Sequence, residues 1–295
     1  MGEFKRGVKN MMRELVKSCK VFKAFNNNIV LVDIDGKETI LFGKGLGFNK
    51  KNGDIIPKGT KYEKIFFIKD EQNVKNFKEV VRKNDKEFIA LCEEMIYEIS
   101  VELNEELNEN IHIGLIDHIS SAINRLAEAE VIDNPFLVEI ETLYPDEFLL
   151  AEKLAKRLEN YTGIFIPPGE RGFITLHIHS ARNNGKLSNT IKYTYICNSV
   201  IETIEDMLNM KIDRKSLDYA RFLTHLRFAI ERILKDLKVE NDFLDLIKIK
   251  YRKAYKVALE VGKIIEESIY RKVNDDEIAY IALHIQRFVK SYKNF

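Results

Sequence analysis

The sequence predicts a multidomain fold in which a small antiparallel β-sheet domain is followed by two all-α helical-bundle domains. Short β-branched runs separated by turn residues occupy positions 20–68. From about Val74, apolar residues recur at three- and four-residue spacing, and the helical part then repeats itself. A length of 295 residues suits two or three domains, and 45% hydrophobic with 32% charged residues is a globular composition.

Four segments are predicted to form an antiparallel meander. Asn26–Asn28 tolerates left-handed backbone and predicts the first turn, and Asp35-Gly36 is a strong hairpin signal. A glycine-rich bend, Gly43–Phe48, and a polar loop precede the last strand. Because so small a sheet cannot bury both faces, we expect dimerisation. The expected strands are Val21–Phe25, Ile29–Ile34, Glu38–Phe42 and Tyr62–Ile68.

The helical region contains an internal repeat. Asp117–Arg125 returns as Thr224–Arg232, and Glu170–Ile178 returns as Glu277–Ile285, with a shift of 107 residues in both cases. Each copy holds two histidines 59 residues apart, which predicts a tandem all-α domain. Two stretches interrupt the helical pattern, namely Gly163–Gly169 with its two prolines and the linker-like Asn183–Asn189.

These patterns divide the chain into four parts. We expect an N-terminal extension over residues 1–18, the sheet domain over 19–73, the first helical domain over 74–186 and the second over 187–295. Residues 1–71 carry 15 Lys and Arg against 9 Asp and Glu, whereas the remainder is net acidic. A basic head on an acidic body indicates that the N-terminal part contacts a polyanion.

The sequence favours a cytoplasmic protein. No apolar run approaches the ~18 residues of a membrane span, and no secretory signal is present. Three widely separated cysteines argue against a disulfide framework or a zinc ribbon. We expect them to be half-buried free thiols: Cys19, Cys92 and Cys197.

The four repeated histidines allow several interpretations. A single histidine in an apolar helix is usually a satisfied core residue. Zinc binding is conceivable, but no His-Glu-x-x-His or cysteine spacing accompanies the histidines. Asp117 and Glu170 lack the substrate motif that acid–base catalysis needs. Phosphoryl acceptance fits, because neutral imidazole is a nucleophile and a phosphate adds about −1.5 to −2 charges. We therefore predict no enzyme, no catalytic or metal-binding residues and no cofactor.

From about Cys19 onward the sequence resembles the BglG/LicT family of bacterial antiterminators. Lys23–Ile29 and Gly43–Lys51 are similar to the family's co-antiterminator RNA-binding domain, and the repeated helical domains resemble its PTS regulation domains. Four segments resemble the glucose-type members: Asn110–Ile113, Asn134–Leu137, Leu143–Glu147 and Leu176–Ala181.

The resemblance implies a set of RNA contacts. In this chemistry lysines neutralise phosphates, amides read base edges, and an aromatic ring stacks on an unpaired base. Many relatives have arginine at the position of Lys44, and lysine lacks its planar fork. The competing interpretation is that Asn26–Asn28 is only a turn and Phe48 only a core residue. The implied contacts are Lys23, Asn26, Asn28, Gly43, Lys44 and Phe48.

The resemblance also implies phosphorylation sites and partners. A sugar-specific permease (enzyme II) subunit of the phosphotransferase system would phosphorylate His118 and His177, and the phosphocarrier HPr would act on His225 and His284. The remaining implied partners are a leader mRNA hairpin that overlaps a terminator and a second copy of the chain. The implied function is transcription antitermination under sugar control, with glucose as the sugar.

Two other classes of function stay open. A DNA-binding activator carrying the same regulatory domains would need a helix-turn-helix, which residues 1–71 do not predict. A histidine phosphocarrier would pass its phosphate onward, but no nucleotide-binding glycine loop accompanies the histidines.

Overall fold

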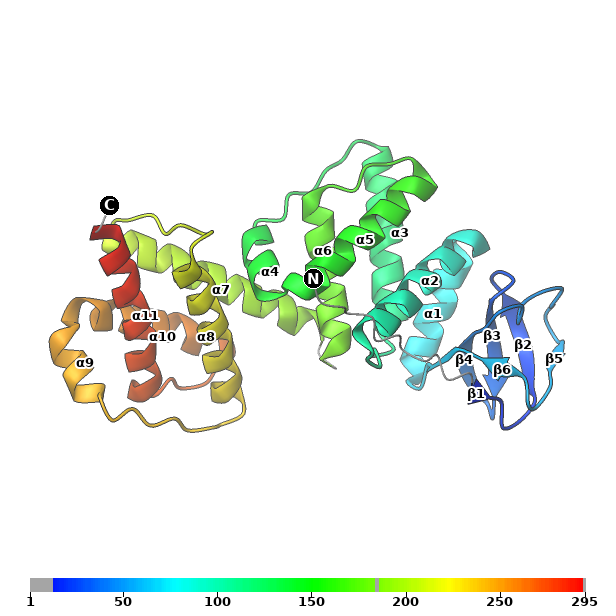
Figure 1. Cartoon of the computed structure of the whole chain (residues 1–295), viewed down its shortest axis with the longest axis horizontal. Helices are drawn as coiled ribbons and strands as arrows, with labels where there is room; N and C mark the ends of the chain where they lie inside the picture. The colour runs from blue at the N-terminus through cyan, green and yellow to red at the C-terminus, as the bar shows by residue number, and fades with distance from the viewer. Residues whose placement is uncertain (1–12, 184–185, 294–295) are drawn as a thin grey trace, which may run out of the picture. The chain divides into compact units, whose positions relative to one another are not determined.

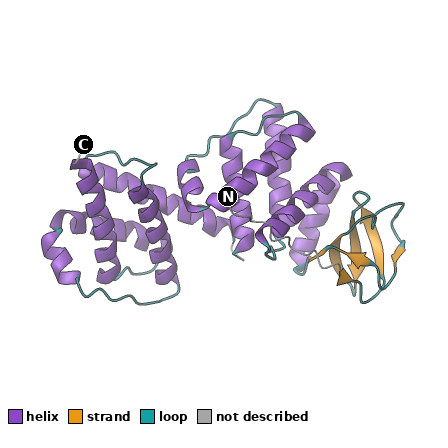
Figure 2. Ribbon diagram, in the orientation of Figure 1, coloured by secondary structure: helices purple, strands orange, loops and turns teal. Residues whose placement is uncertain are grey.

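The computed structural model describes residues 13–183 and 186–293 and confirms a small sheet followed by helices (Figures 1 and 2). By its internal contacts the chain divides into two compact units. The first is Met1–Val131 with Leu154–Ile166 and Ser180–Asn184, and the second is Ile132–Lys153 with Pro167–His179 and Gly185–Phe295. Because these units do not follow the sequence repeat, the predicted domain limits stay a prediction.

The main sheet contains the four predicted strands and a fifth, although the last predicted strand, Tyr62–Ile68, is shortened to Lys64–Phe67 because Tyr62 pairs in a separate two-stranded ladder. The sheet has the order β5-β2-β3-β4-β7, and every neighbouring pair is antiparallel. The added strand, β5, lies beside β2 at the edge; it has only two residues next to Pro57, too few to show a periodic pattern. The strands are β2 (Cys19–Ala24), β3 (Ile29–Ile34), β4 (Lys37–Phe42), β5 (Ile55–Ile56) and β7 (Lys64–Phe67).

Part of the expected N-terminal extension is a strand. Arg13–Glu14 forms β1, which pairs antiparallel with β6 (Lys61–Tyr62). The first twelve residues of the expected extension lie outside the described residues. The Asp35-Gly36 hairpin is confirmed: both residues have positive φ, 55° and 77°, and join Ile34 to its partner Lys37. Such a turn matches the twist of the two strands it connects.

One face of the sheet carries a compact apolar core. Its buried members come from the strands and from the loops between them, because alternate side chains of a strand point to the same face. They are Leu15, Cys19, Val21, Val30, Val32, Leu41, Leu46 and Ile56. Residues 13–70, as described by the structure, contain no helix, so this part of the chain provides no helix-turn-helix for a DNA-binding activator.

Three helices complete the main part of the first unit: α1 (Glu71–Lys83), α2 (Lys86–Leu103) and α3 (Ile111–Ala127). The chain becomes helical three residues earlier than the periodicity indicated, because the Asp70 side chain accepts hydrogen bonds from the amides of Gln72 and Asn73. Asp85 caps α2 in the same way through the amide of Phe88. A carboxylate at this position satisfies amides that have no partner within the helix.

The remaining helices show the predicted repeat with the same shift. Three helices of the first copy reappear 107 residues later: α4 (Leu137–Leu143) as α9 (Leu244–Lys250), α5 (Pro145–Thr162) as α10 (Arg252–Ile269), and α6 (Pro168–Arg182) as α11 (Asp275–Lys293). The repeated motifs themselves lie on α3 and α6, and again on α8 (Leu217–Leu234) and α11. Among the described helices, none is long and apolar enough to span a membrane.

The expected linker is shorter than predicted. Helix α7 (Leu187–Leu208) begins inside Asn183–Asn189, so Leu187, Ser188 and Asn189 are helical. Their Ser and Asn content suits a linker, but the apolar side chains that follow pack in the core of the second unit and continue the helix to this point.

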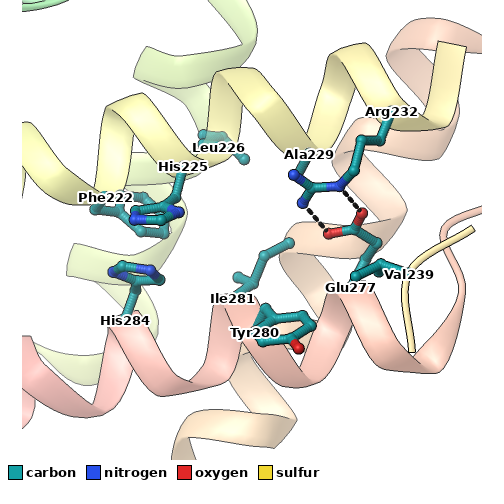
Figure 3. A pocket seen from close by; sticks show the side chains of 10 residues that line it. All are labelled: Phe222, His225, Leu226, Ala229, Arg232, Val239, Glu277, Tyr280, Ile281 and His284. Carbon is teal, nitrogen blue, oxygen red and sulfur yellow. Dashed lines mark hydrogen bonds and ion pairs between the residues drawn. The ribbon is translucent and has the colours of Figure 1, made fainter. Parts of the chain in front are cut away.

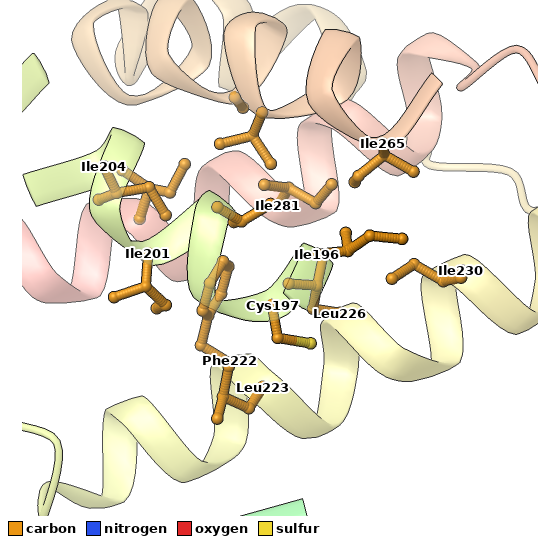
Figure 4. Packing of buried hydrophobic residues seen from close by; sticks show 14 of the residues in the cluster. Ile196, Cys197, Ile201, Ile204, Phe222, Leu223, Leu226, Ile230, Ile265 and Ile281 are labelled. Atoms are coloured by element: carbon orange, nitrogen blue, oxygen red, sulfur yellow. The ribbon is translucent and has the colours of Figure 1, made fainter. Parts of the chain in front are cut away.

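The core of the second unit is built mainly from aliphatic residues on α7, α8, α10 and α11 (Figure 4). Cys197 lies within it, and burial raises the pKa of its thiol to about 12. Cys19 and Cys92 are also buried free thiols, so the expectation of half-buried cysteines is wrong. These thiols are packing residues at neutral pH.

Candidate functional site

The turn Asn26–Asn28 and the loop Gly43–Phe48 are tied together by hydrogen bonds. The Asn26 side-chain oxygen accepts from the amides of Asn28 and Ile29, at 2.8 and 2.9 Å. The amide of Gly43 donates to the carbonyl oxygen of Asn28 at 3.0 Å. The amide of Gly45 donates to the Asn28 side-chain oxygen at 3.1 Å. Asparagine side chains therefore shape this surface, as the turn interpretation predicted.

Gly47 allows the loop to approach the turn. Its amide donates to the carbonyl oxygen of Asn27 at 3.0 Å, and a Cβ at this position would lie 2.0 Å from the carbonyl oxygen of Asn26. The next residue, Phe48, is 60% exposed. Phe48 is therefore not a core residue, and its ring is available to stack on a base.

Three of the six predicted RNA contacts line one cavity of about 440 Å³, namely Asn28, Gly43 and Lys44. Asn26 lies in the adjoining turn, and Phe48 extends from the far end of the loop. Lys23 lies apart from the cavity, on β2, at a register shift in its pairing with β3. The structure thus brings most of the predicted set together at one end of the sheet.

The same cavity has an acidic wall that the sequence did not reveal. It is formed by Glu63 and by three residues of α2, Glu94, Tyr97 and Glu98. Both α2 carboxylates bond the guanidinium of Arg157, Glu94 at 3.0 Å and Glu98 through a shorter contact. Spacings of three and four residues on α2 would have placed these side chains on one helix face. The sequence contains no sign that this face meets the sheet.

The second histidine pair forms a distinct site in the second unit. His225 projects from α8 and His284 from α11, and their ring centroids lie 4.5 Å apart (Figure 3). His225 is exposed and His284 is partly buried. Burial, together with the neighbouring His225 and Arg287, lowers the pKa of His284 to about 4. The His284 imidazole is therefore neutral at pH 7, the form that can act as a nucleophile.

A bidentate ion pair lies in the same pocket, which has a volume of about 200 Å³. The Arg232 guanidinium donates to both carboxylate oxygens of Glu277, from Nε at 2.6 Å and from Nη2 at 2.7 Å (Figure 3). Arg232 stands seven residues after His225 on α8, and Glu277 seven residues before His284 on α11. This pair therefore joins the two helices that carry the histidines.

The first histidine pair is divided between the compact units. His118 lies on α3 in the first unit and His177 on α6 in the second, and both are partly buried. Two other histidines have buried or nearly buried carboxylate partners. His112 bonds Glu93 and His179 bonds Glu147, each at 2.8 Å. Among residues 13–183 and 186–293, no three His, Cys, Asp or Glu side chains gather as a metal site would require.

The comparisons with known proteins agree with this arrangement. The family described as "CAT RNA binding domain" matches residues 19–75, and the family described as "PRD domain" matches residues 93–181 and again 198–288. The chain belongs to the BglG/LicT family of antiterminators.

Several members of the BglG/LicT family are similar to the chain over nearly its whole length. "Transcription antiterminator LicT" of Bacillus subtilis is 34% identical over 92% of this chain and 99% of its own length. "PtsGHI operon antiterminator" of the same organism is 38% identical over 92% and 97%. "Protein GlcT" of Staphylococcus haemolyticus is 32% identical over 91% and 95%.

A solved structure, "Crystal structure of GlcT CAT-PRDI", is 41% identical to this chain. It corresponds to 57% of this chain and 99% of that chain, with a TM-score of 0.49. The names of these family members describe regulators of transcription rather than enzymes.

Proposed function

We propose that this chain is a cytoplasmic RNA-binding antiterminator that stabilises a leader-RNA hairpin overlapping a terminator, under the control of histidine phosphorylation. The observation that carries the proposal is the shared end of the sheet, where Asn28, Gly43 and Lys44 line one cavity and Phe48 is exposed beside it. Asn28 offers an amide that can bond a base edge, and Gly43 lets RNA come close to the protein backbone. Lys44 can neutralise a phosphate, and the Phe48 ring can stack on an unpaired base. Asn26, in the adjoining turn, extends this surface, and Lys23 on β2 is a proposed separate phosphate contact.

His118, His177, His225 and His284 are the proposed phosphorylation sites. We assign the first two to a sugar-specific permease subunit and the second two to HPr, with glucose as the governing sugar. Relatives named GlcT and "PtsGHI operon antiterminator" support this choice of sugar. The neutral imidazole of His284 supports phosphoryl acceptance in the second pair.

The switch proposed here acts through a homodimer. Two sheets of a symmetric dimer would together hold one RNA hairpin, and phosphate on the first regulatory domain would add negative charge at the dimer interface. Repulsion between the two charged sites would separate the protomers and release the RNA. Asp at both His118 and His177 should therefore weaken both dimerisation, measured by sedimentation, and RNA binding; wild-type values for both would contradict the switch.

A gel-shift titration of the full chain tests the RNA function directly. The probe is a terminator-overlapping leader hairpin from the genome that encodes this chain, compared with single-stranded and duplex DNA. We expect hairpin-selective binding that is lost in Phe48→Ala and Asn28→Ala. Phe67→Ala removes another exposed ring of the same sheet and should bind normally. Equal binding to the three nucleic acids would contradict RNA recognition and would favour a different role for the N-terminal domain.

A further inference from the structure

The RNA-binding turn is in contact with an acidic face of α2 in the same compact unit. The Asn26 side-chain amide donates to Glu94 Oε1 at 2.8 Å. Its oxygen is already engaged with the amides of Asn28 and Ile29. Both functional groups of the Asn26 side chain therefore have protein partners in this structure, whereas reading a base edge would require at least one of them to exchange partners.

Aromatic contacts also join the sheet to the first helices. The rings of Phe42 on β4 and Tyr97 on α2 are stacked, with centroids 5.0 Å apart and planes 15° from parallel. The Tyr97 hydroxyl donates to Glu63 Oε2 at 3.0 Å. On the neighbouring helix α3, the His112 ring meets the Phe66 ring of β7 edge-on at 4.6 Å. A stacked aromatic pair and charge-assisted hydrogen bonds give this contact a defined geometry.

The charge on this helix face opposes RNA. Glu94 and Glu98 line the cavity into which Asn28 and Lys44 also face. A phosphate entering the cavity would meet these carboxylates, and like charges at such short range repel. Arg157 bonds both carboxylates and so keeps them in place along the wall.

We infer that the α2 face formed by Glu94, Tyr97 and Glu98 is a docking surface for the RNA-binding turn of the same chain, and that RNA and α2 compete for this turn. The inference rests on the proposed RNA-binding function. It assigns the first helical region a direct role: α2 occupies the RNA-binding surface until RNA displaces it.

The first test removes the two charges. In the full chain, the double substitution Glu94→Gln and Glu98→Gln should tighten binding of the labelled leader hairpin about tenfold, because a hydrogen bond to a charged group is replaced by one to a neutral group and the repulsion is lost. Glu79→Gln with Glu87→Gln is the matched control, since both residues are exposed and lie outside the cavity. The control should bind RNA like the wild-type chain.

The outcomes separate the two proposals. Equal affinities of the wild-type chain and the Glu94, Glu98 variant would overturn the competition while leaving RNA binding intact. An equal gain in the control variant would show a general charge effect and would also overturn it. Absence of hairpin binding in all three proteins would overturn the RNA-binding function and, with it, the competition.

The second test follows the contact itself. The chain contains no tryptophan, so Tyr97→Trp introduces a single reporter against Phe42. Saturation with the hairpin should expose the indole and move its emission to longer wavelength. Tyr292→Trp, at a residue that is 56% exposed on α11, is the control and should show no shift. Unchanged emission of the Tyr97→Trp protein while anisotropy shows bound hairpin would mean that α2 stays in place, and the inference would be wrong.

Discussion

Arg232→Met tests whether the ion pair between α8 and α11 holds the second histidine pair in place. The Glu277 side chain is 2% exposed and accepts both bonds of the bidentate pair, whereas the Arg232 side chain is 32% exposed. Methionine keeps most of the length and apolar contact of the arginine stem. The substitution therefore removes the guanidinium and leaves a buried carboxylate without its cation.

The expected cost follows from this burial. Breaking a fully buried ion pair from one side costs about 3–5 kcal/mol, because one charge is left uncompensated. Water reaches the Arg232 side of this pair, so we expect the lower end, about 3 kcal/mol. Replacing both partners, Arg232→Met with Glu277→Leu, removes the buried charge as well. The double variant should lose less unfolding free energy than the two single variants lose together, and the difference, the coupling energy, should be about 2 kcal/mol.

The assay is urea unfolding of the full chain, followed by circular dichroism at 222 nm. Because two compact units need not unfold together, hydrogen exchange of peptides from α8 and α11 should localise the loss to these helices. A cost below about 0.5 kcal/mol for Arg232→Met, or strict additivity in the double variant, would refute the conclusion that the pair fastens the two helices.

Three further predictions follow from single residues. The pKa of His284 is lowered to about 4 from an ordinary value of 6.5, so the neutral ring contributes its full stability above pH 6.5 and loses it as the pH falls toward 4. NMR titration of the ring protons should show this pKa, and a normal pKa would contradict the partial burial of His284 in the histidine pair. Tyr219→Phe removes a 2.6 Å hydrogen bond to buried Glu139 and should cost about 1–3 kcal/mol in urea unfolding, whereas no cost would mean that Glu139 finds another donor. Tyr270 is 87% exposed with a φ of 55°, so Tyr270→Gly should stabilise the chain by about 0.5 kcal/mol, and a loss of stability would show that its ring contacts matter more than its backbone.

Sequence patterns predicted the elements well where the cause was local. The Asp35-Gly36 hairpin depends on two adjacent residues that accept positive φ, and it formed as expected. The repeat predicted matching helices, because the same spacing of apolar residues produces the same helix at either position. The linker predicted over Asn183–Asn189 is too long at its C-terminal end, where Leu187–Asn189 are helical, because polar composition is a weaker signal than the packing of the helix that follows.

The partners of buried polar groups could not be predicted. His112 and Tyr219 are equivalent in the repeat, yet His112 bonds Glu93 on α2 while Tyr219 bonds Glu139 on α4. These partners are 19 and 80 residues away in the sequence. The position of either residue in the sequence does not indicate which carboxylate will be its partner, because the partner depends on how whole helices pack.

The sequence by itself determined the order of sheet and helices and the duplication, because periodicity, turn chemistry and family motifs depend on residues that are close together in the chain. The residues assigned to RNA and to phosphate stay a prediction. Only the tertiary structure decided that His225 faces His284, that Arg232 and Glu277 fasten their helices, and that Glu94 bonds Asn26. Each of these contacts joins segments that are distant in the chain, and such contacts are set by the packing of complete faces rather than by any local pattern.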